Sequence, residues 1–303
     1  MSLILALLAA LVSGVFGATT KQHAADPPIG PAAESVSAPP VRTFSDVSEL
    51  LVALEEADRG IRTFSSQIRY TRLFEVQNDI QQRGGMLYFR TDPPATDRPG
   101  QPLPQRRRWV TVRFDELIAG GRRDRQEQLF VFDGEWLVEK DAAQKQFTKR
   151  RVARPGQVFD PLRVGEGPFF VPIGQRREDM ELFFTAAIRP PEVGLSDEFD
   201  PDRDRLFKAL AARLQGCIQL ELIPKPNLEQ VENFTLIRIW YDPVTLLPRA
   251  SLAVDRLGDV DVFELFRIDV NEEKSPLPSG VFSVDAPGLD EGYHIEIIDE
   301  TTG

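Results

Sequence analysis

The sequence has one cysteine and two histidines among its 303 residues. A lone cysteine, Cys217, excludes an intrachain disulfide, and its place before an apolar alternation is typical of a buried structural thiol. The histidines, His23 and His294, lie in a linker-like stretch and near the C-terminus. A catalytic triad or a zinc site needs a histidine within the folded body. We therefore predict a protein that is not an enzyme, with no catalytic residue, no metal site and no cofactor.

Positive charge is also scarce, since 36 Lys and Arg oppose 47 Asp and Glu and give a net charge of −11. Nucleic-acid binding needs clustered basic residues, so nucleic acid is not an expected partner. The basic runs at 106–108 and 122–125 stand beside acidic residues or prolines, and we expect them in solvated loops and strand ends. Acidic pairs such as Glu55 with Glu56 are expected at solvated positions too, which disfavours acid–base catalysis.

The apolar run at the N-terminus, Leu3–Phe16, is too short to span a bilayer comfortably and ends in small residues. We expect residues 1–18 to be a cleaved signal peptide and the protein to be periplasmic or otherwise exported. An N-terminal membrane anchor is the alternative, because no Lys or Arg precedes the run. Residues 19–43 are rich in Pro, Ala and Ser, which predicts a disordered linker.

The remaining residues, 44–303, combine three helical patterns with many strands. Apolar residues recur at helical spacing from Val47 to Ile61, with Ser45 as the expected N-cap and Gly60 at the end. Further helices are expected at about 178–187 and 201–215. The 20 phenylalanines suit pleated, half-buried surfaces.

Two groups of strands, each with the pattern of an antiparallel meander, flank the segment 155–216. The first has expected strands at 68–74, 87–89, 109–114, 128–132, 136–139 and 147–152, with 77–85 as a connection and 91–105 as a loop. The second has expected strands at 217–224, 234–241, 248–255 and 259–269. They predict either two domains or one large sheet interrupted by a helical insertion. Several strands are apolar on both faces, as where Phe130 and Phe132 alternate with Leu129 and Val131, so both faces need cover.

Five short segments resemble, in order, the lipoprotein carrier superfamily of LolA and LolB. They are Gly60–Ser66 after the first helix, Arg108 with Trp109 at a strand start, the hairpin Phe132–Leu137, the turn Ile239–Pro243 with Leu247 and Pro248, and the ending Leu277–Pro287. The chain is similar to a divergent member, because the loop 91–107 and the segment 155–216 are longer than in the carrier.

The resemblance implies a mainly β fold with helices (α+β), an unclosed antiparallel β-barrel wrapped around helices that plug its concave side. It implies one half-barrel domain over residues 44–303, with a helical insertion at about 155–216. It also implies a carrier that holds acyl chains in a hydrophobic cavity between the curved sheet and a helical lid. The implied partners are a lipid or acylated lipoprotein, an inner-membrane donor and an outer-membrane acceptor.

Strand residues with aromatic or aliphatic side chains are the candidates to line that cavity. They are Phe89, Trp109, Phe130, Phe132, Trp136, Leu222, Ile239, Leu252 and Phe266. Arg108 is the nearest match to a family arginine that pairs a barrel strand with the lid helix. The alternative function is a periplasmic sensor or interaction protein that binds a protein partner with the same fold.

Overall fold

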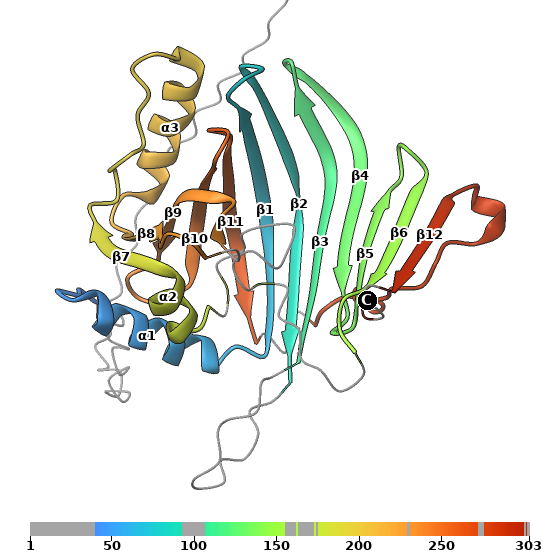
Figure 1. The fold of residues 1–303 in the computed structure, drawn as a ribbon, viewed down its shortest axis with the longest axis horizontal. Coiled ribbons are helices and arrows are strands. Elements are labelled where there is room, and N and C mark those ends of the chain that lie inside the picture. Colours follow the sequence, from blue (N-terminus) through green and yellow to red (C-terminus); the bar gives the residue numbers. More distant parts are fainter. Residues whose placement is uncertain are drawn as a thin grey trace, which may run out of the picture. The chain divides into compact units, whose positions relative to one another are not determined.

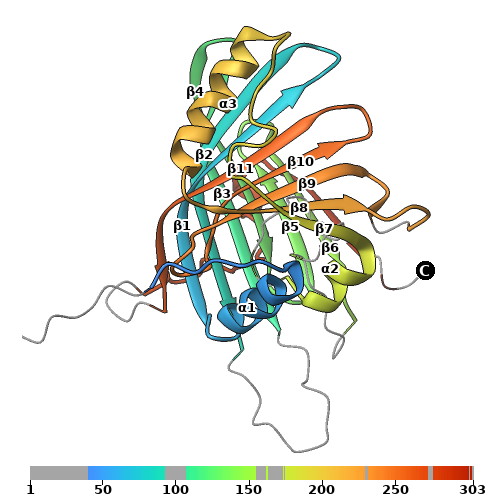
Figure 2. The same cartoon turned by 90° about the vertical axis from the view of Figure 1, so that its left-hand side faces the viewer.

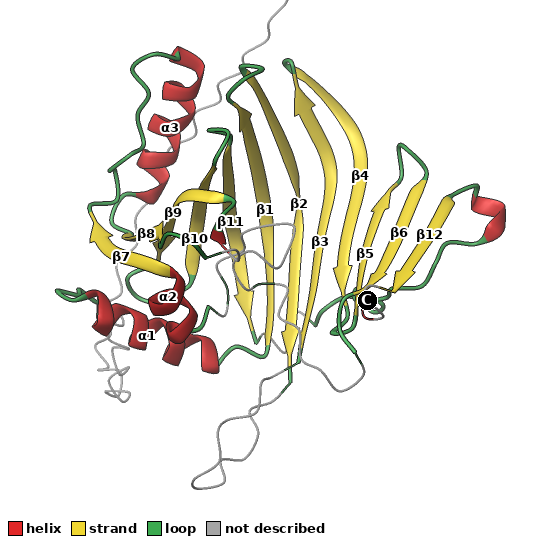
Figure 3. Cartoon of the chain, viewed as in Figure 1, coloured by secondary structure: helices red, strands yellow, loops and turns green. Residues whose placement is uncertain are grey.

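The computed structural model describes residues 40–92, 107–154, 162, 173, 175–228, 231–271, 276–299 and 301. These residues form one sheet of twelve strands with three α-helices (Figures 1 and 3). The helices are α1 (Val47–Arg59), α2 (Arg177–Phe183) and α3 (Pro201–Leu214). The strands are β1 (Thr63–Phe74), β2 (Asp79–Thr91), β3 (Arg108–Ala119), β4 (Arg122–Phe132), β5 (Trp136–Asp141), β6 (Gln146–Arg151), β7 (Phe184–Arg189), β8 (Ile218–Pro224), β9 (Phe234–Tyr241), β10 (Pro248–Asp255), β11 (Val260–Val270) and β12 (His294–Asp299).

The strand order is β12-β6-β5-β4-β3-β2-β1-β11-β10-β9-β8-β7, so β12 and β7 are the two edges and the sheet is open. Neighbouring strands run antiparallel except β12 and β6, which run parallel. The two meanders join where β1 pairs with β11, with Tyr70 opposite Phe263. They are therefore halves of one sheet, and the predicted open antiparallel β fold with helices is confirmed.

Local capping explains where the helices begin and end. Asp46, and not the predicted Ser45, is the N-cap of α1, because its carboxylate accepts from the Ser48 amide at 3.0 Å. Gly60 ends α1 as predicted. Asp200 caps α3 by accepting from the amides of residues 202 and 203, and α3 occupies the predicted range.

Several predicted elements differ from the structure in extent, and β1, β3 and β4 are longer than the predicted strands at 68–74, 109–114 and 128–132. The helix expected at 178–187 ends at Phe183, and the next six residues form β7, because pairing with β8 outweighs their helical pattern. The connection expected at 77–85 is mostly strand. The turn occupies residues 75–78, where Asn78 takes φ 49°, and Gly85 lies inside β2. A Cβ on Gly85 would fall 1.8 Å from the Arg113 carbonyl oxygen, so glycine here permits close approach of two strands.

Alternation along the strands gives the sheet two faces with different covers. The α1 face carries two apolar clusters, one with Leu50 and Leu51 of α1 and Met180 and Phe183 of α2, and one centred on β1–β4. Its strand members include Phe64, Ile68, Phe89, Phe114, Phe132, Leu220, Leu222, Ile237, Ile239, Phe263 and Leu265. Helices α1 and α2 lie side by side (Figures 1 and 2).

The α3 face is covered in two separate places. Helix α3 packs Phe207, Leu210 and Leu214 on Leu73, Trp240, Ala250, Leu252, Val260 and Val262. At the other side, Phe282, Val284, Tyr293 and Ile295 of the C-terminal segment pack on Val131, Val138 and Phe147. Because Ile239 and Trp240 are neighbours in β9, α1 and α3 lie on opposite faces of the sheet. The helices are thus divided between both faces.

Candidate functional site

Helices α1 and α2 form a cover over the apolar α1 face, and polar contacts fasten this cover. Arg108 Nη2, at the start of β3, lies 3.6 Å from Asp58 Oδ2 of α1, and the two side chains are only 12% and 20% exposed. Arg177 of α2 donates to the Ser48 hydroxyl at 3.2 Å, which ties the two helices together. Because the Arg108–Asp58 pair is largely shielded from solvent, salt screens it less than a surface pair.

The space beneath α1 is small in this conformation. A cavity of about 30 Å³ lies between α1 and the sheet. Its lining includes Leu51, Leu54, Ala57 and Asp58 of α1, Ile173, Met180 of α2, Leu220 and Tyr241 of the sheet, and Leu247 of the connection between β9 and β10. Ligand pockets measure roughly 300–1,000 Å³, so this space holds no more than about two waters. An acyl chain enters only if the cover moves.

Tyr241 brings a polar group to this apolar space. Burial, and secondly the nearby Asp58 carboxylate, raises the pKa of its hydroxyl well above the ordinary value. The phenol is therefore neutral at any physiological pH and adds no charge to the lining.

The nine predicted cavity residues do not face one space. Five lie on the α1 face, namely Phe89, Phe130, Phe132, Leu222 and Ile239. Four lie on the α3 face, namely Trp109, Trp136, Leu252 and Phe266. Of the first five, Leu222 and Ile239 belong to the cluster that packs directly on α1 and α2.

Three of the aromatic residues on the α3 face lie beside cations instead of other apolar groups. The Arg90 and Arg107 guanidinium carbons lie 4.3 and 5.1 Å from the Trp109 ring centroid. The Arg69 guanidinium carbon lies 5.2 Å from the Phe266 ring centroid. Trp136 has Lys149 and Arg151 within 5.5 Å of its ring. Such cation–π contacts are typical of half-buried aromatic residues at a solvated border.

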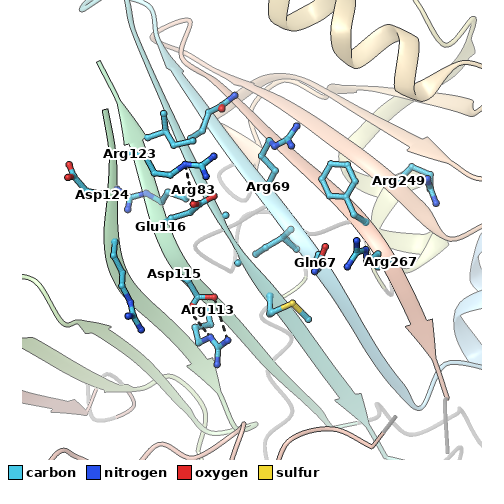
Figure 4. A pocket seen from close by; sticks show the side chains of 18 residues that line it. Gln67, Arg69, Arg83, Arg113, Asp115, Glu116, Arg123, Asp124, Arg249 and Arg267 are labelled. Atoms are coloured by element: carbon cyan, nitrogen blue, oxygen red, sulfur yellow. Dashed lines mark hydrogen bonds and ion pairs between the residues drawn. The ribbon is translucent and has the colours of Figure 1, made fainter. Parts of the chain in front are cut away.

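A second hollow, an arginine groove of about 1270 Å³, lies on the α3 face. Its described lining includes Arg69, Arg83, Arg113, Arg123, Arg125, Arg249 and Arg267, together with Asp115, Glu116 and Asp124. Figure 4 shows Arg113 and Asp115 at one side and Arg249 and Arg267 at the other. No sequence pattern predicted this groove, because its arginines come from β1–β4 and from β10 and β11, which are distant from β1–β4 in the chain.

Other expected features have simple positions in the fold. Cys217 is half-buried beside the α3 cluster, and burial raises the pKa of its thiol. Among the described residues, no three His, Cys, Asp or Glu side chains are grouped to hold a metal ion. No described helix is long and apolar enough to cross a membrane. The expected signal peptide, the expected linker up to residue 39 and residues 93–105 of the loop expected at 91–105 lie outside the described residues, while Thr91 is the last residue of β2.

Comparison with known proteins gives structural similarities only. No protein family and no curated protein sequence matches this chain. A putative outer membrane lipoprotein-sorting protein domain from Vibrio parahaemolyticus is 12% identical, with a TM-score of 0.32 over 78% of this chain and 95% of that chain. A LolA superfamily protein from Nitrosomonas europaea is 10% identical, with a TM-score of 0.24 over 77% of this chain and 97% of that chain.

The MucA/MucB complex structure from Pseudomonas aeruginosa is also similar, at 15% identity and a TM-score of 0.32 over 80% of this chain and 61% of that chain. At these identities and TM-scores the similarities say nothing about what this chain binds. The chain is thus similar to solved structures that include one of the LolA superfamily, the family whose motifs its own segments resemble.

Proposed function

We propose that this protein is an exported, non-enzymatic lipid- or lipoprotein-binding carrier whose α1 and α2 form a lid over the apolar α1 face. In this proposal the structure is the closed, unloaded state. The observation that carries it is the arrangement of the lid. A short amphipathic helix covers an apolar surface and is tied to β3 by the shielded Arg108–Asp58 ion pair.

The energetics of such a lid favour reversible binding. Burial of apolar surface is worth about 25 cal/mol per Å² whether an acyl chain or the lid provides it. Leu50 and Leu51 of α1 and Met180 of α2 are fully packed in the closed state. An entering acyl chain replaces their contacts instead of adding to them, so the net free energy of binding stays small enough for release. Donor and acceptor proteins of an export route would be the natural partners.

Loosening the lid tests the proposal. Arg108→Ala removes the ion pair, and we expect a fluorescent fatty acid to bind about threefold or more faster than to the unchanged protein, because opening becomes easier. Asp58→Ala should give the same result. Stopped-flow fluorescence measures the rate, and native mass spectrometry of the purified chain detects bound acyl chains.

Arg122→Ala is the matched control, since Arg122 also forms an ion pair, with Asp124, but its side chain is 80% exposed and lies outside the lining of both hollows. It should leave the rate unchanged. The proposal is wrong if neither the unchanged protein nor the Arg108 and Asp58 variants binds any acyl chain.

A further inference from the structure

The middle of the α3 face is hollow because of local backbone features. Gly84 and Gly85 place no side chains on the floor, and the pairing of β2 with β3 shifts register between them. A second irregularity lies in the pairing of β1 with β11, where Arg267 and Ile268 lie opposite the single residue Ser66. There Arg267 adopts φ 48°, a left-handed conformation that costs a non-glycine residue about 1 kcal/mol or more. Bulges of this kind re-aim side chains, and strained residues often mark functional surfaces.

The groove carries positive charge that the protein does not neutralise. Arg113 pairs with Asp115, Arg123 with Glu116, and Arg69 with Glu264. Arg83 donates to Gln128. The other three lining arginines, Arg125, Arg249 and Arg267, are exposed and make no ion pair with any residue that the structure describes. The groove is therefore positively charged although the chain as a whole has a net charge of −11.

We propose that the arginine groove binds an extended acidic segment of a partner protein. Guanidinium groups match carboxylates in a planar, bidentate geometry. From β10 to β4 the groove crosses five strand spacings, about 24 Å, which an extended chain of about seven residues spans. Apolar floor residues, Met86 and Phe266, can pack against uncharged side chains between the acidic ones.

Other anionic ligands fit this groove less well. A single phosphate group cannot reach arginines on strands as far apart as β4 and β10. A flat bilayer surface does not reach the floor of a hollow of about 1270 Å³. Nucleic acid carries dense charge along its whole length and would meet the acidic remainder of the chain. This surface is separate from the α1 face, so the inference stands independently of the proposed lipid site.

The probe for the test is a fluorescein-labelled hexaglutamate peptide, and the readout is fluorescence anisotropy with the full chain. The groove variant combines Arg125→Gln, Arg249→Gln and Arg267→Gln. We expect it to weaken binding about tenfold, with a smaller dependence of Kd on salt concentration. The three side chains are exposed, so the fold should persist, and circular dichroism checks this.

The control variant removes the same number of charges elsewhere, with Arg59→Gln, Arg205→Gln and Arg256→Gln, whose side chains are 61, 79 and 65% exposed. It should bind the peptide as the unchanged protein does. Equal weakening by both variants, or no binding of the peptide at all, overturns the proposal. So does displacement of the peptide by micromolar inorganic phosphate, or groove-dependent binding to phosphatidylglycerol vesicles without binding to the peptide.

Discussion

The two faces of the sheet differ in how their apolar residues are distributed. On the α1 face two clusters extend from β7 to β4, and both contribute side chains to the small cavity under α1. On the α3 face the apolar residues form two separate patches, one under α3 and one under the C-terminal segment, with the arginine groove between them. A sheet whose strands are apolar on both faces therefore needs cover only over the parts of each face where apolar residues are clustered.

The α3 patch should contribute most to stability. Trp240 is fully buried there, and its indole N–H donates to the Pro191 carbonyl at 2.8 Å. Trp240→Ala should lower the free energy of unfolding by about 3–5 kcal/mol, measured by urea denaturation. Trp109→Ala removes a half-buried ring from the same face and should cost only about 1 kcal/mol. Equal losses would mean that the two parts of this face are equally well covered.

A buried carboxylate on the same face should make stability depend on pH. Burial alone would raise the pKa of Glu221, but hydrogen bonds from Arg189 and Arg238 bring it below the ordinary value. A lowered pKa in the folded state means that the stabilisation is present above pH about 4.3 and is lost as the pH falls further.

Glu221→Gln should therefore cost about 3 kcal/mol at neutral pH, because two arginines lose their buried partner. It should also flatten the loss of stability below pH about 4. Urea denaturation at a series of pH values measures both effects. If the variant loses stability below pH about 4 as steeply as the unchanged protein does, other carboxylates cause that loss.

A substitution at Gly85, which lines the groove on the α3 face, should have a smaller effect on stability. Gly85→Ala places a methyl group against the Arg113 carbonyl and should destabilise the sheet by about 1–3 kcal/mol. Gly60→Ala is the control, since φ is −76° there and the nearest atom lies 3.6 Å away. It should change stability by less than about 1 kcal/mol. Thermal unfolding of both variants gives the comparison.

The smallest effect is expected where an irregular segment provides the cover. Phe282 is only half-buried against β4–β6 and stacks on Arg90. Phe282→Ala should cost about 1 kcal/mol, whereas Phe207→Ala in α3 should cost about 3 kcal/mol. If denaturant midpoints place the two losses in the reverse order, the C-terminal segment is the stronger cover.

Strand positions in the second meander followed directly from its sequence. β9 and β10 occupy the predicted ranges, because turn residues such as Asp242 with Pro243 bound clear apolar runs. β2 was missed over much of its length, because Gln81, Gln82 and Arg83 are polar and two glycines follow them. β7 was taken for helix, since only its partner β8 specifies it.

The candidate sites were harder to predict than the strands. Ile239 and Trp240 are both large and apolar, so the sequence does not show which of them faces α1 and which faces α3. The resemblance pointed to Arg108 but to no partner for it, because Asp58 is far from Arg108 in the chain. The groove depends on bulges that bring Arg249 and Arg267 to one surface with Arg125. No local sequence pattern predicts such bulges.

The parallel pairing of β12 with β6 has a consequence for the order of folding. Arg151 and Asp299 meet across this pair although 148 residues separate them in the chain. Until β12 arrives, the edge of β6 presents unpaired backbone amides and carbonyls, which is a recognised hazard for association with other chains. Contacts of such long sequence separation also form slowly. The edge of β6 is therefore the part of the sheet that remains exposed to association with other chains until β12 is in place.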